Sequence, residues 1–231
     1  MKIGIIGAMD IEVAALVDEL EGVQSQTFIG MTFNEGLLNG VPVVVVMCGI
    51  GKVNAALCAH VLIDHYAVDS VINTGVAGSL DVRINIGDLV VSTDAVYHDV
   101  NVEALGYAPG QMPDMDTFSF AADEGMCDIV CDVLREVAPN VQVYRGRVAS
   151  GDQFVSSAEQ KDRIVETFGA LCCEMEGAAI AHACYLAKVP FVIVRAISDK
   201  ADGSADMDYP TFKVEAARTC AALVGQVVQR L

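Results

Sequence analysis

The chain is 231 residues long, with 53% hydrophobic and 19% charged residues, and its 31 acidic and 14 basic side chains give a formal net charge of −17. No basic run interrupts this acidity, which argues against nucleic acid or an anionic membrane as a partner and favours a neutral or cationic ligand. The length suits one domain, residues 1–231, and the apolar composition indicates an ordered globular protein with room for a buried subunit contact.

The sequence carries no sign of membrane insertion, export or a metal site. No apolar run is long enough to span a bilayer, and the opening MKIGIIGAMDIE is too short and too acidic for a signal peptide, so we expect a cytoplasmic protein. The eight cysteines include no CxxC pair and lie mostly among Ala, Val and Leu, as reduced core residues do. Cys127 and Cys131 are four apart, but no third or fourth ligand clusters with them, so the sequence predicts no metal and no other cofactor.

Apolar runs bounded by Gly, Asn and Asp alternate with Ala-rich stretches of helical period, which predicts an α/β fold without repeats or a domain boundary. Strands are expected at 2–8, twice near 27–38, and at 41–48, 70–78, 88–99, 141–150, 170–175 and 190–197. Helices are expected at 13–21, capped by Asp10, and at 52–66, 121–137, 157–167, 177–187 and in the C-terminal segment.

Residues 100–120 interrupt this alternation. The stretch VNVEALGYAPGQMPDMDTFSF contains two prolines, two glycines and the exposed-looking apolar residues Leu105, Tyr107 and Met112. Loops of this length in compact domains usually have a function or cover something, so we expect a functional loop here.

Glycine turns follow several of the expected strands. CGIGKVNA (48–55) lies between a buried strand and a helix, but Val46 and Val53 stand where a phosphate loop needs Gly and Ser or Thr, and Asn54 stands where a dinucleotide fingerprint needs Gly. In open α/β sheets ligands bind at such strand ends, so the turns still predict a ligand site.

Four acids lie where a strand ends or a helix begins: Glu12, Glu174, Glu176 and Asp199. Taken singly, each has an ordinary explanation as a helix-dipole partner or a turn residue. Taken together, they would meet at one edge of the sheet. Several carboxyl groups around a neutral ligand suit cleavage of a glycosidic bond, because one protonates the leaving group and another activates water.

Arg195 lies inside the apolar strand FVIVRAI and needs a buried acid, because a guanidinium does not lose its proton. Strand alternation would place Glu174 and Glu176 on one face, so either could be the partner. One of the two is then structural, and the other is free to meet a ligand.

The segments MKIGIIGAMDIEV, CGIGKVNAAL, VINTGVAGSL, SGDQFV, EMEGAAIAH and VPFVIVRAISDKAD resemble, in order and spacing, the 5'-methylthioadenosine/S-adenosylhomocysteine nucleosidases of the purine nucleoside phosphorylase/nucleosidase superfamily. The resemblance runs from Met1 to the C-terminal helix. It implies a mixed sheet flanked by helices, a homodimer, and cofactor-free hydrolysis by water of 5'-thioadenosine nucleosides, releasing adenine and a thioribose.

The resemblance also implies roles for particular residues. Glu12 would activate water, and Asp199 would protonate or hydrogen-bond N7 of the departing adenine. Glu176 would bind the ribose hydroxyls, with Glu174 pairing Arg195 or organising water. The remaining positions implied for the substrate pocket are Met9, Ile50, Val76, Ala77, Gly78, Phe154 stacking on adenine, Val155, Met175, Arg195 and Tyr209, with Leu105 and Pro113 from the neighbouring subunit.

The chain departs from the family pattern at two of these positions, because Val76 stands where a serine is frequent and Leu105 where an aromatic residue is frequent.

Two alternative functions remain open. A purine nucleoside phosphorylase would share the fold, although Glu12 would repel phosphate and only Lys52 and Arg195 offer positive charge near strand ends. A purine-binding sensor without turnover would share the pocket.

Overall fold

The computed structural model describes residues 1–200 and 205–231. Its strands are β1 (Ile3–Gly7), β2 (Glu21–Phe28), β3 (Met31–Leu38), β4 (Val41–Met47), β5 (Ser70–Ser79), β6 (Leu89–Tyr97), β7 (Phe120–Ala121), β8 (Val143–Ser150), β9 (Cys172–Glu174) and β10 (Phe191–Asp199). Its helices are α1 (Asp10–Asp18), α2 (Lys52–Asp64), the 3₁₀ turn Glu103–Leu105, α3 (Glu124–Val137), α4 (Ala158–Phe168), α5 (Gly177–Ala187) and α6 (Ala205–Val227).

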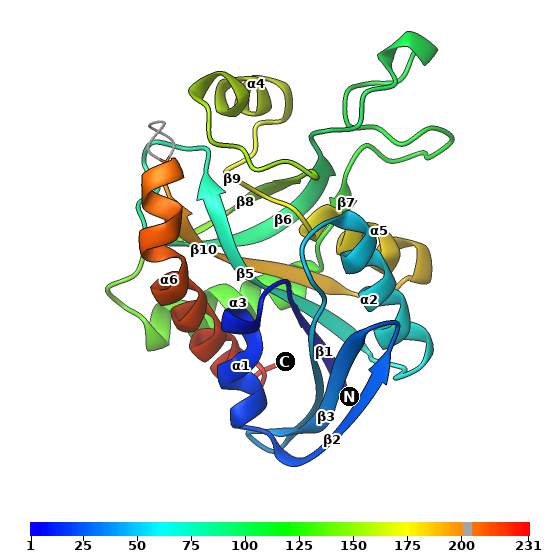
Figure 1. The fold of residues 1–231 in the computed structure, drawn as a ribbon, viewed down its shortest axis with the longest axis vertical. Helices are drawn as coiled ribbons and strands as arrows, with labels where there is room; N and C mark the ends of the chain where they lie inside the picture. The colour runs from blue at the N-terminus through cyan, green and yellow to red at the C-terminus, as the bar shows by residue number, and fades with distance from the viewer. Residues whose placement is uncertain (201–204) are drawn as a thin grey trace.

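The strands form one mixed sheet, in the order β10-β6-β8-β9-β5-β1-β4-β3-β2, with β7 paired to β6. A further pairing of β10 with β5 closes five of the strands into a ring, and β1 to β4 extend from that ring as an open sheet (Figure 1). Since β1 and β10 both run parallel to β5, their carboxyl ends lie at the same edge.

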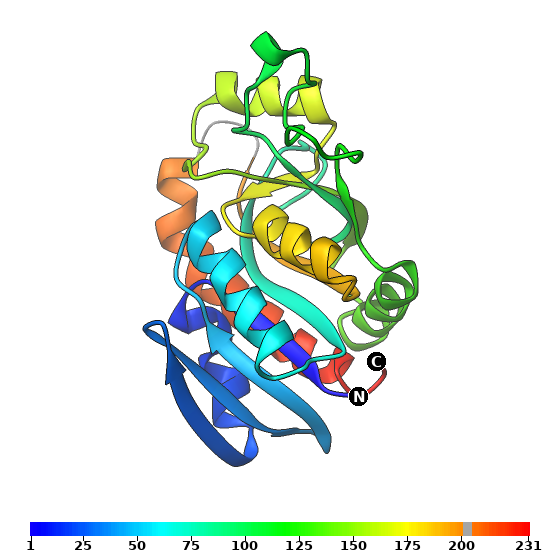
Figure 2. The same cartoon turned by 90° about the vertical axis from the view of Figure 1, so that its right-hand side faces the viewer.

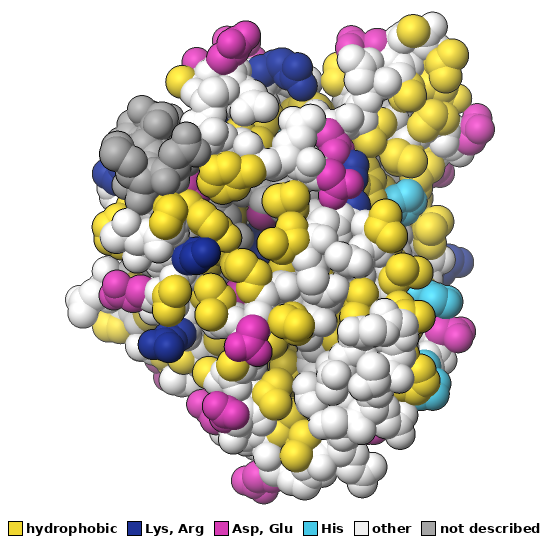
Figure 3. All heavy atoms as spheres, viewed as in Figure 1, with side chains coloured by type: hydrophobic (Ala, Val, Ile, Leu, Met, Phe, Trp, Pro, Cys, Tyr) yellow, Lys and Arg dark blue, Asp and Glu magenta, His cyan; other side chains and the backbone are white. Residues whose placement is uncertain are grey.

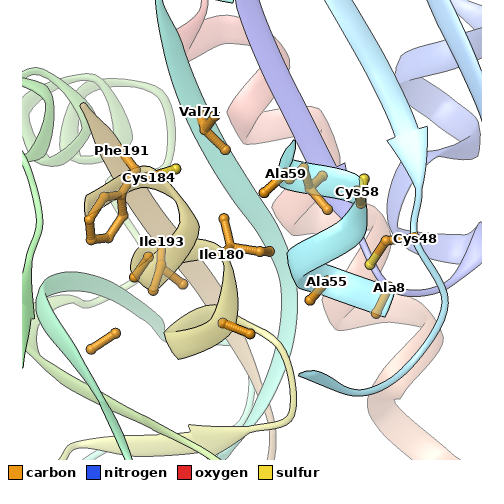
Figure 4. Close-up of a cluster of buried hydrophobic side chains, with 14 of the residues drawn as sticks. Ala8, Cys48, Ala55, Cys58, Ala59, Val71, Ile180, Cys184, Phe191 and Ile193 are labelled. Carbon is orange, nitrogen blue, oxygen red and sulfur yellow. The ribbon is translucent and has the colours of Figure 1, made fainter. Parts of the chain in front are cut away.

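Helices cover both faces of the sheet. One core cluster packs α1, α3 and α6 against the strands, and another packs α2 and α5 on the opposite face. Figure 2 shows α2 and α5 side by side, and Figure 4 shows the small side chains between them and the sheet, among them Ala55, Cys58 and Ala59 of α2. All eight cysteines are buried and unpaired, as expected from their apolar neighbours.

The α/β class and the order of elements are confirmed, with one clear boundary error. The first helix was expected to continue to Glu21, but it ends at Asp18, and β2 already begins at Glu21. β2 is an edge strand with exposed side chains along almost its whole length, so it lacks the apolar alternation by which a strand is recognised. Likewise, Asp10 is the first residue of α1, and Met9 precedes it as the N-cap.

The expected loop at 100–120 contains only the 3₁₀ turn and the start of β7, and it projects from the body of the molecule at the upper right of Figure 1. No helix within residues 1–200 and 205–231 has both the length and the apolar character that crossing a bilayer requires.

Candidate active site

A pocket lies at the carboxyl ends of β1, β5 and β10. Its volume is about 570 Å³, which includes solvent space at its open side. In Figure 3 hydrophobic side chains surround a hollow on the face viewed in Figure 1. The described residues that line the pocket are Ala8, Met9, Glu12, Ile50, Val76, Ala77, Gly78, Gln153, Phe154, Val155, Cys173, Glu174, Met175, Glu176, Ser198, Asp199 and Tyr209.

Glu12 lies in the first turn of α1 and is 1% exposed. Its Oε2 accepts hydrogen bonds from the main-chain N–H groups of Ala8 (2.7 Å) and Met9 (2.9 Å), and its Oε1 accepts one from that of Val76 (3.0 Å). Burial raises the pKa of this carboxyl group above its ordinary value of 4.5, although Arg195 and the three main-chain donors oppose the shift. A fixed, buried carboxylate of this kind suits the acceptance of a proton from water.

Arg195 is fully buried in β10, and Glu174 is its acid partner, as one of the two expected possibilities. Its guanidinium also donates to Asn73 Oδ1 (2.6 Å). Glu174 in turn accepts hydrogen bonds from Ser150 and from the main chain at the start of α5. Arg195 does not line the pocket, and its guanidinium holds in place the carboxylate of Glu174, which does line it.

Glu176 lies beyond the end of β9, at the N-cap of α5, so strand alternation does not apply to it. Its Oε1 accepts a hydrogen bond from the main chain of Gly51 (2.8 Å), and its Oε2 lies 3.8 Å from Arg195 Nη2. Burial and the neighbouring charge of Glu174 raise the pKa of Glu176 to about 7, against the attraction of Arg195. This carboxyl group is less firmly paired than Glu174 and faces the pocket.

Asp199 is 2% exposed at the end of β10. Its Oδ1 accepts a hydrogen bond from Ser198 Oγ (3.0 Å), and its Oδ2 lies 3.3 Å from the ammonium group of Lys161 on α4. Gly78 of β5 packs directly against the carboxyl group, because a Cβ at position 78 would lie 2.8 Å from Asp199 Oδ2.

We therefore expect Gly78→Ala to displace Asp199 and to lower kcat/KM about 100-fold, the effect of a misplacement of about 1 Å. Gly125→Ala on α3 is the matched control, because its Cβ would come no closer than 3.3 Å to its nearest neighbour, Asp123. Steady-state kinetics would contradict this expectation if the two alanine variants had the same kcat/KM.

The apolar side of the pocket includes two aromatic rings. Phe154, 49% exposed, meets Tyr209 edge to face with ring centroids 5.4 Å apart. Tyr209 Oη also lies 3.6 Å from Met9 Sδ, and Ile50 is 52% exposed at the pocket. A half-exposed ring at the pocket offers a surface on which a flat base can stack.

The pocket brings together most of the predicted residues, but Arg195, Leu105 and Pro113 do not line it. Leu105, 71% exposed, and Pro113 lie on the projecting loop and do not line the pocket of their own chain. The pocket residues that sequence reasoning missed are Ala8, Gln153, Cys173 and Ser198, each adjacent in sequence to a predicted residue.

The chemistry available in this pocket is that of carboxyl groups. Its lining within the described part of the chain contains no Lys, Arg or His. The two nearby buried cations, Arg195 and Lys161, are each in contact with an acid. The pocket therefore suits a neutral ligand on which positive charge develops, rather than an anion.

The chain matches known proteins along its whole length. Residues 2–230 match the phosphorylase superfamily. The 5'-methylthioadenosine/S-adenosylhomocysteine nucleosidase of Tolumonas auensis is 38% identical over 232 residues, covering 100% of both chains.

Solved structures agree with this match. The nucleosidase of the same name from Colwellia psychrerythraea, in complex with adenine, is 38% identical with a TM-score of 0.95, covering 100% of this chain and 96% of that one. The futalosine hydrolase of Helicobacter pylori is 34% identical with a TM-score of 0.93, covering 100% and 98%. From the fold, the carboxyl-lined pocket and these full-length matches, the chain belongs to the 5'-methylthioadenosine/S-adenosylhomocysteine nucleosidase family of the phosphorylase superfamily.

Proposed function

We propose that the protein hydrolyses the N-glycosidic bond of 5'-methylthioadenosine and S-adenosylhomocysteine, and also of 5'-deoxyadenosine, releasing adenine and the 5'-substituted ribose. This activity would serve methionine salvage and recycling of the methyl cycle. The observation that carries the proposal is the convergence of Glu12, Glu176 and Asp199, all buried, on one pocket without a free cation among its described residues.

Each acid has a separate task in the proposed reaction. Glu12 takes a proton from water as the oxygen attacks the anomeric carbon, and Asp199 gives a proton to the departing adenine. Glu176 accepts hydrogen bonds from the ribose hydroxyls. Because the sugar becomes positively charged in the transition state, carboxylates close to it stabilise charge that is absent from the substrate.

The apolar residues hold the two ends of the nucleoside. Adenine would stack on Phe154 beside the main chain of Val155, and Met9, Ile50, Met175 and Tyr209 would surround the ribose and the 5' substituent. Val76 lacks the hydroxyl group frequent in the family, but its main-chain N–H donates to Glu12, so the base is fixed without that hydroxyl. Ala77 and Gly78 leave room for the purine beside Asp199.

Adenine release from 5'-methylthioadenosine in phosphate-free buffer tests the proposal. We expect release without phosphate and no acceleration on adding it. Release that requires phosphate would show a phosphorylase, and no release under either condition, with purine binding retained, would show a sensor.

We further propose that the protein acts as a homodimer, in which Leu105 and Pro113 reach the neighbouring pocket. The projecting loop carries a gathering of hydrophobic side chains (Figure 3), and Val53 and Leu57 of α2 are exposed. Apolar surface of this kind is typical of subunit contacts.

Sedimentation at micromolar concentration should therefore give twice the chain mass of 24.4 kDa. Leu105→Asp should raise KM for 5'-methylthioadenosine more than it lowers kcat, because it places a charge beside the 5' substituent of the neighbouring site. Val82→Asp is a control at another strongly exposed apolar residue, at 82% exposure. A monomer alone in the wild-type protein would rule out the shared site.

A second substrate class merits testing, because the Helicobacter pylori relative is a futalosine hydrolase at 34% identity. Apolar pockets discriminate weakly between substituents, so a futalosine-type nucleoside is a candidate substrate of the same pocket. Comparing kcat/KM for this nucleoside and for 5'-methylthioadenosine would rank the two substrates.

The unpaired, buried cysteines support the cytoplasm as the compartment of the protein.

A further inference from the structure

Lys161 is a buried lysine next to the pocket and has no role among those that the family resemblance implies. It lies on α4 and is 2% exposed, whereas Glu159, Gln160 and Asp162 around it are exposed. Burying an ammonium group is costly unless it is paired and hydrogen-bonded, so the partners of Lys161 indicate its purpose.

Those partners are at the end of β10. The ammonium group lies 3.3 Å from Asp199 Oδ2 and also donates a hydrogen bond to the main-chain carbonyl of Lys200. The side chains of Lys161 and Asp199 are 2% and 3% exposed, so water screens this ion pair little.

The two buried cations near the pocket are each paired with a different acid. Arg195 pairs with Glu174 and lies 3.8 Å from Glu176, whereas Lys161 pairs with Asp199. Asp199 is the acid to which the proposed function assigns protonation of the leaving adenine. The positive charge of Lys161 thus lies beside Asp199, which becomes a carboxylate during the proposed reaction.

We propose that Lys161 is a positioning residue for the leaving-group step, holding the Asp199 carboxyl group toward the purine and strengthening it as an acid. The inference rests on the proposed role of Asp199. In this step the O–H bond of Asp199 breaks as an N–H bond forms on adenine, and the electron pair of the glycosidic bond passes into the purine. The ammonium group of Lys161 then stabilises the carboxylate that remains.

The charge of Asp199 also acts on Cys172 and Cys173 of β9 and on Tyr209 of α6, which stay neutral around pH 7. Burial is the largest cause that raises the pKa of each, and it brings Cys173 to about 12. Substituting Lys161 therefore changes the charge beside Asp199 without changing the charge of these three side chains.

The test compares the pH dependence of kcat/KM for 5'-methylthioadenosine in Lys161→Met and Lys161→Arg. Asp199 must be protonated to act as an acid, so activity falls as pH rises through its titration. Without the positive charge, Asp199 should keep its proton to a higher pH. In Lys161→Met the basic limb of the kcat/KM profile should therefore shift to higher pH by about one unit or more. At neutral pH kcat should fall about tenfold, a fraction of what a general acid contributes.

Lys161→Arg retains the charge and should keep the limb within a few tenths of a pH unit of the wild type. Arg163→Met is the matched control, because it removes a positive charge from an exposed position on the same helix. If Lys161→Met does not fold, Lys161→Gln gives the same comparison. An unshifted basic limb in the folded neutral variant would overturn the proposal.

Asp199→Asn separates this inference from the proposed function. If Asp199→Asn retains normal turnover, the role of Asp199 itself is wrong. If it loses turnover while Lys161→Met keeps the wild-type limb, only the inference about Lys161 fails. If Lys161 acts through Asp199, adding Lys161→Met to Asp199→Asn should change the residual kcat by less than about twofold.

Discussion

Glu12→Gln should lower kcat about 100- to 10,000-fold, the range lost when a general base is removed. The amide has nearly the same shape but cannot take a proton from water. Burial raises the pKa of Glu12 above 4.5, so in the wild type the base is protonated, and activity is lost, at a higher pH than for an exposed glutamate. The acid limb of the kcat profile should accordingly lie above pH 4.5 and be absent from any residual activity of Glu12→Gln.

The substitution should leave the fold intact, with some loss of stability. Glu12 accepts hydrogen bonds on both carboxylate oxygens, from Ala8 and Met9 on one and from Val76 on the other, and glutamine retains one acceptor oxygen. Thermal unfolding and adenine binding check that the site survives. Glu35→Gln, at a glutamate paired with Lys2 outside the pocket, should retain normal kcat. Near-normal turnover in Glu12→Gln would mean that another group activates water.

Asp199→Asn is expected to lower kcat by about 100- to 10,000-fold while changing substrate affinity much less. The purine can still form hydrogen bonds with the asparagine side-chain amide. However, no carboxyl proton is available when the glycosidic bond breaks. Adenine is a poor leaving group as an anion, so the lost proton affects the chemical step directly. Rapid-quench measurement of adenine formed in a single turnover, together with equilibrium binding of 5'-methylthioadenosine, separates the two effects.

A buried aspartate with a different task provides the control. Asp88 is 8% exposed and accepts hydrogen bonds from the main chain of Asn85 (2.8 Å) and Gln142 (3.3 Å), outside the pocket. Asp88→Asn should lower stability but not the rate of bond cleavage. If both asparagine variants lost single-turnover rate equally, the effect of Asp199→Asn would be structural and not chemical.

The buried charges explain how much of the site could be predicted from sequence. Arg195 within an apolar strand required an acid, and Glu174 is that acid. Alternation failed at Glu176, because β9 ends at Glu174 and the chain turns into α5. A pattern with a period of two holds only as long as the strand continues.

The burial of Lys161 and the early start of β2 escaped prediction for a related reason. Lys161 is flanked in sequence by polar residues that are exposed, so its helix pattern resembles that of a solvated face, and only the position of α4 over Asp199 buries it. β2 has exposed side chains and is held by pairing with β3, which sequence periodicity does not register. The contribution of Leu105 and Pro113 depends on a second subunit and stays a prediction.

In the proposed reaction, water activated by Glu12 is the nucleophile. Turnover of 5'-methylthioadenosine in water enriched in oxygen-18, with inorganic phosphate present, tests it most directly by mass spectrometry of the sugar. We expect one labelled oxygen at the anomeric position for each adenine released, with no sugar phosphate. A pentose 1-phosphate without the label would contradict the account.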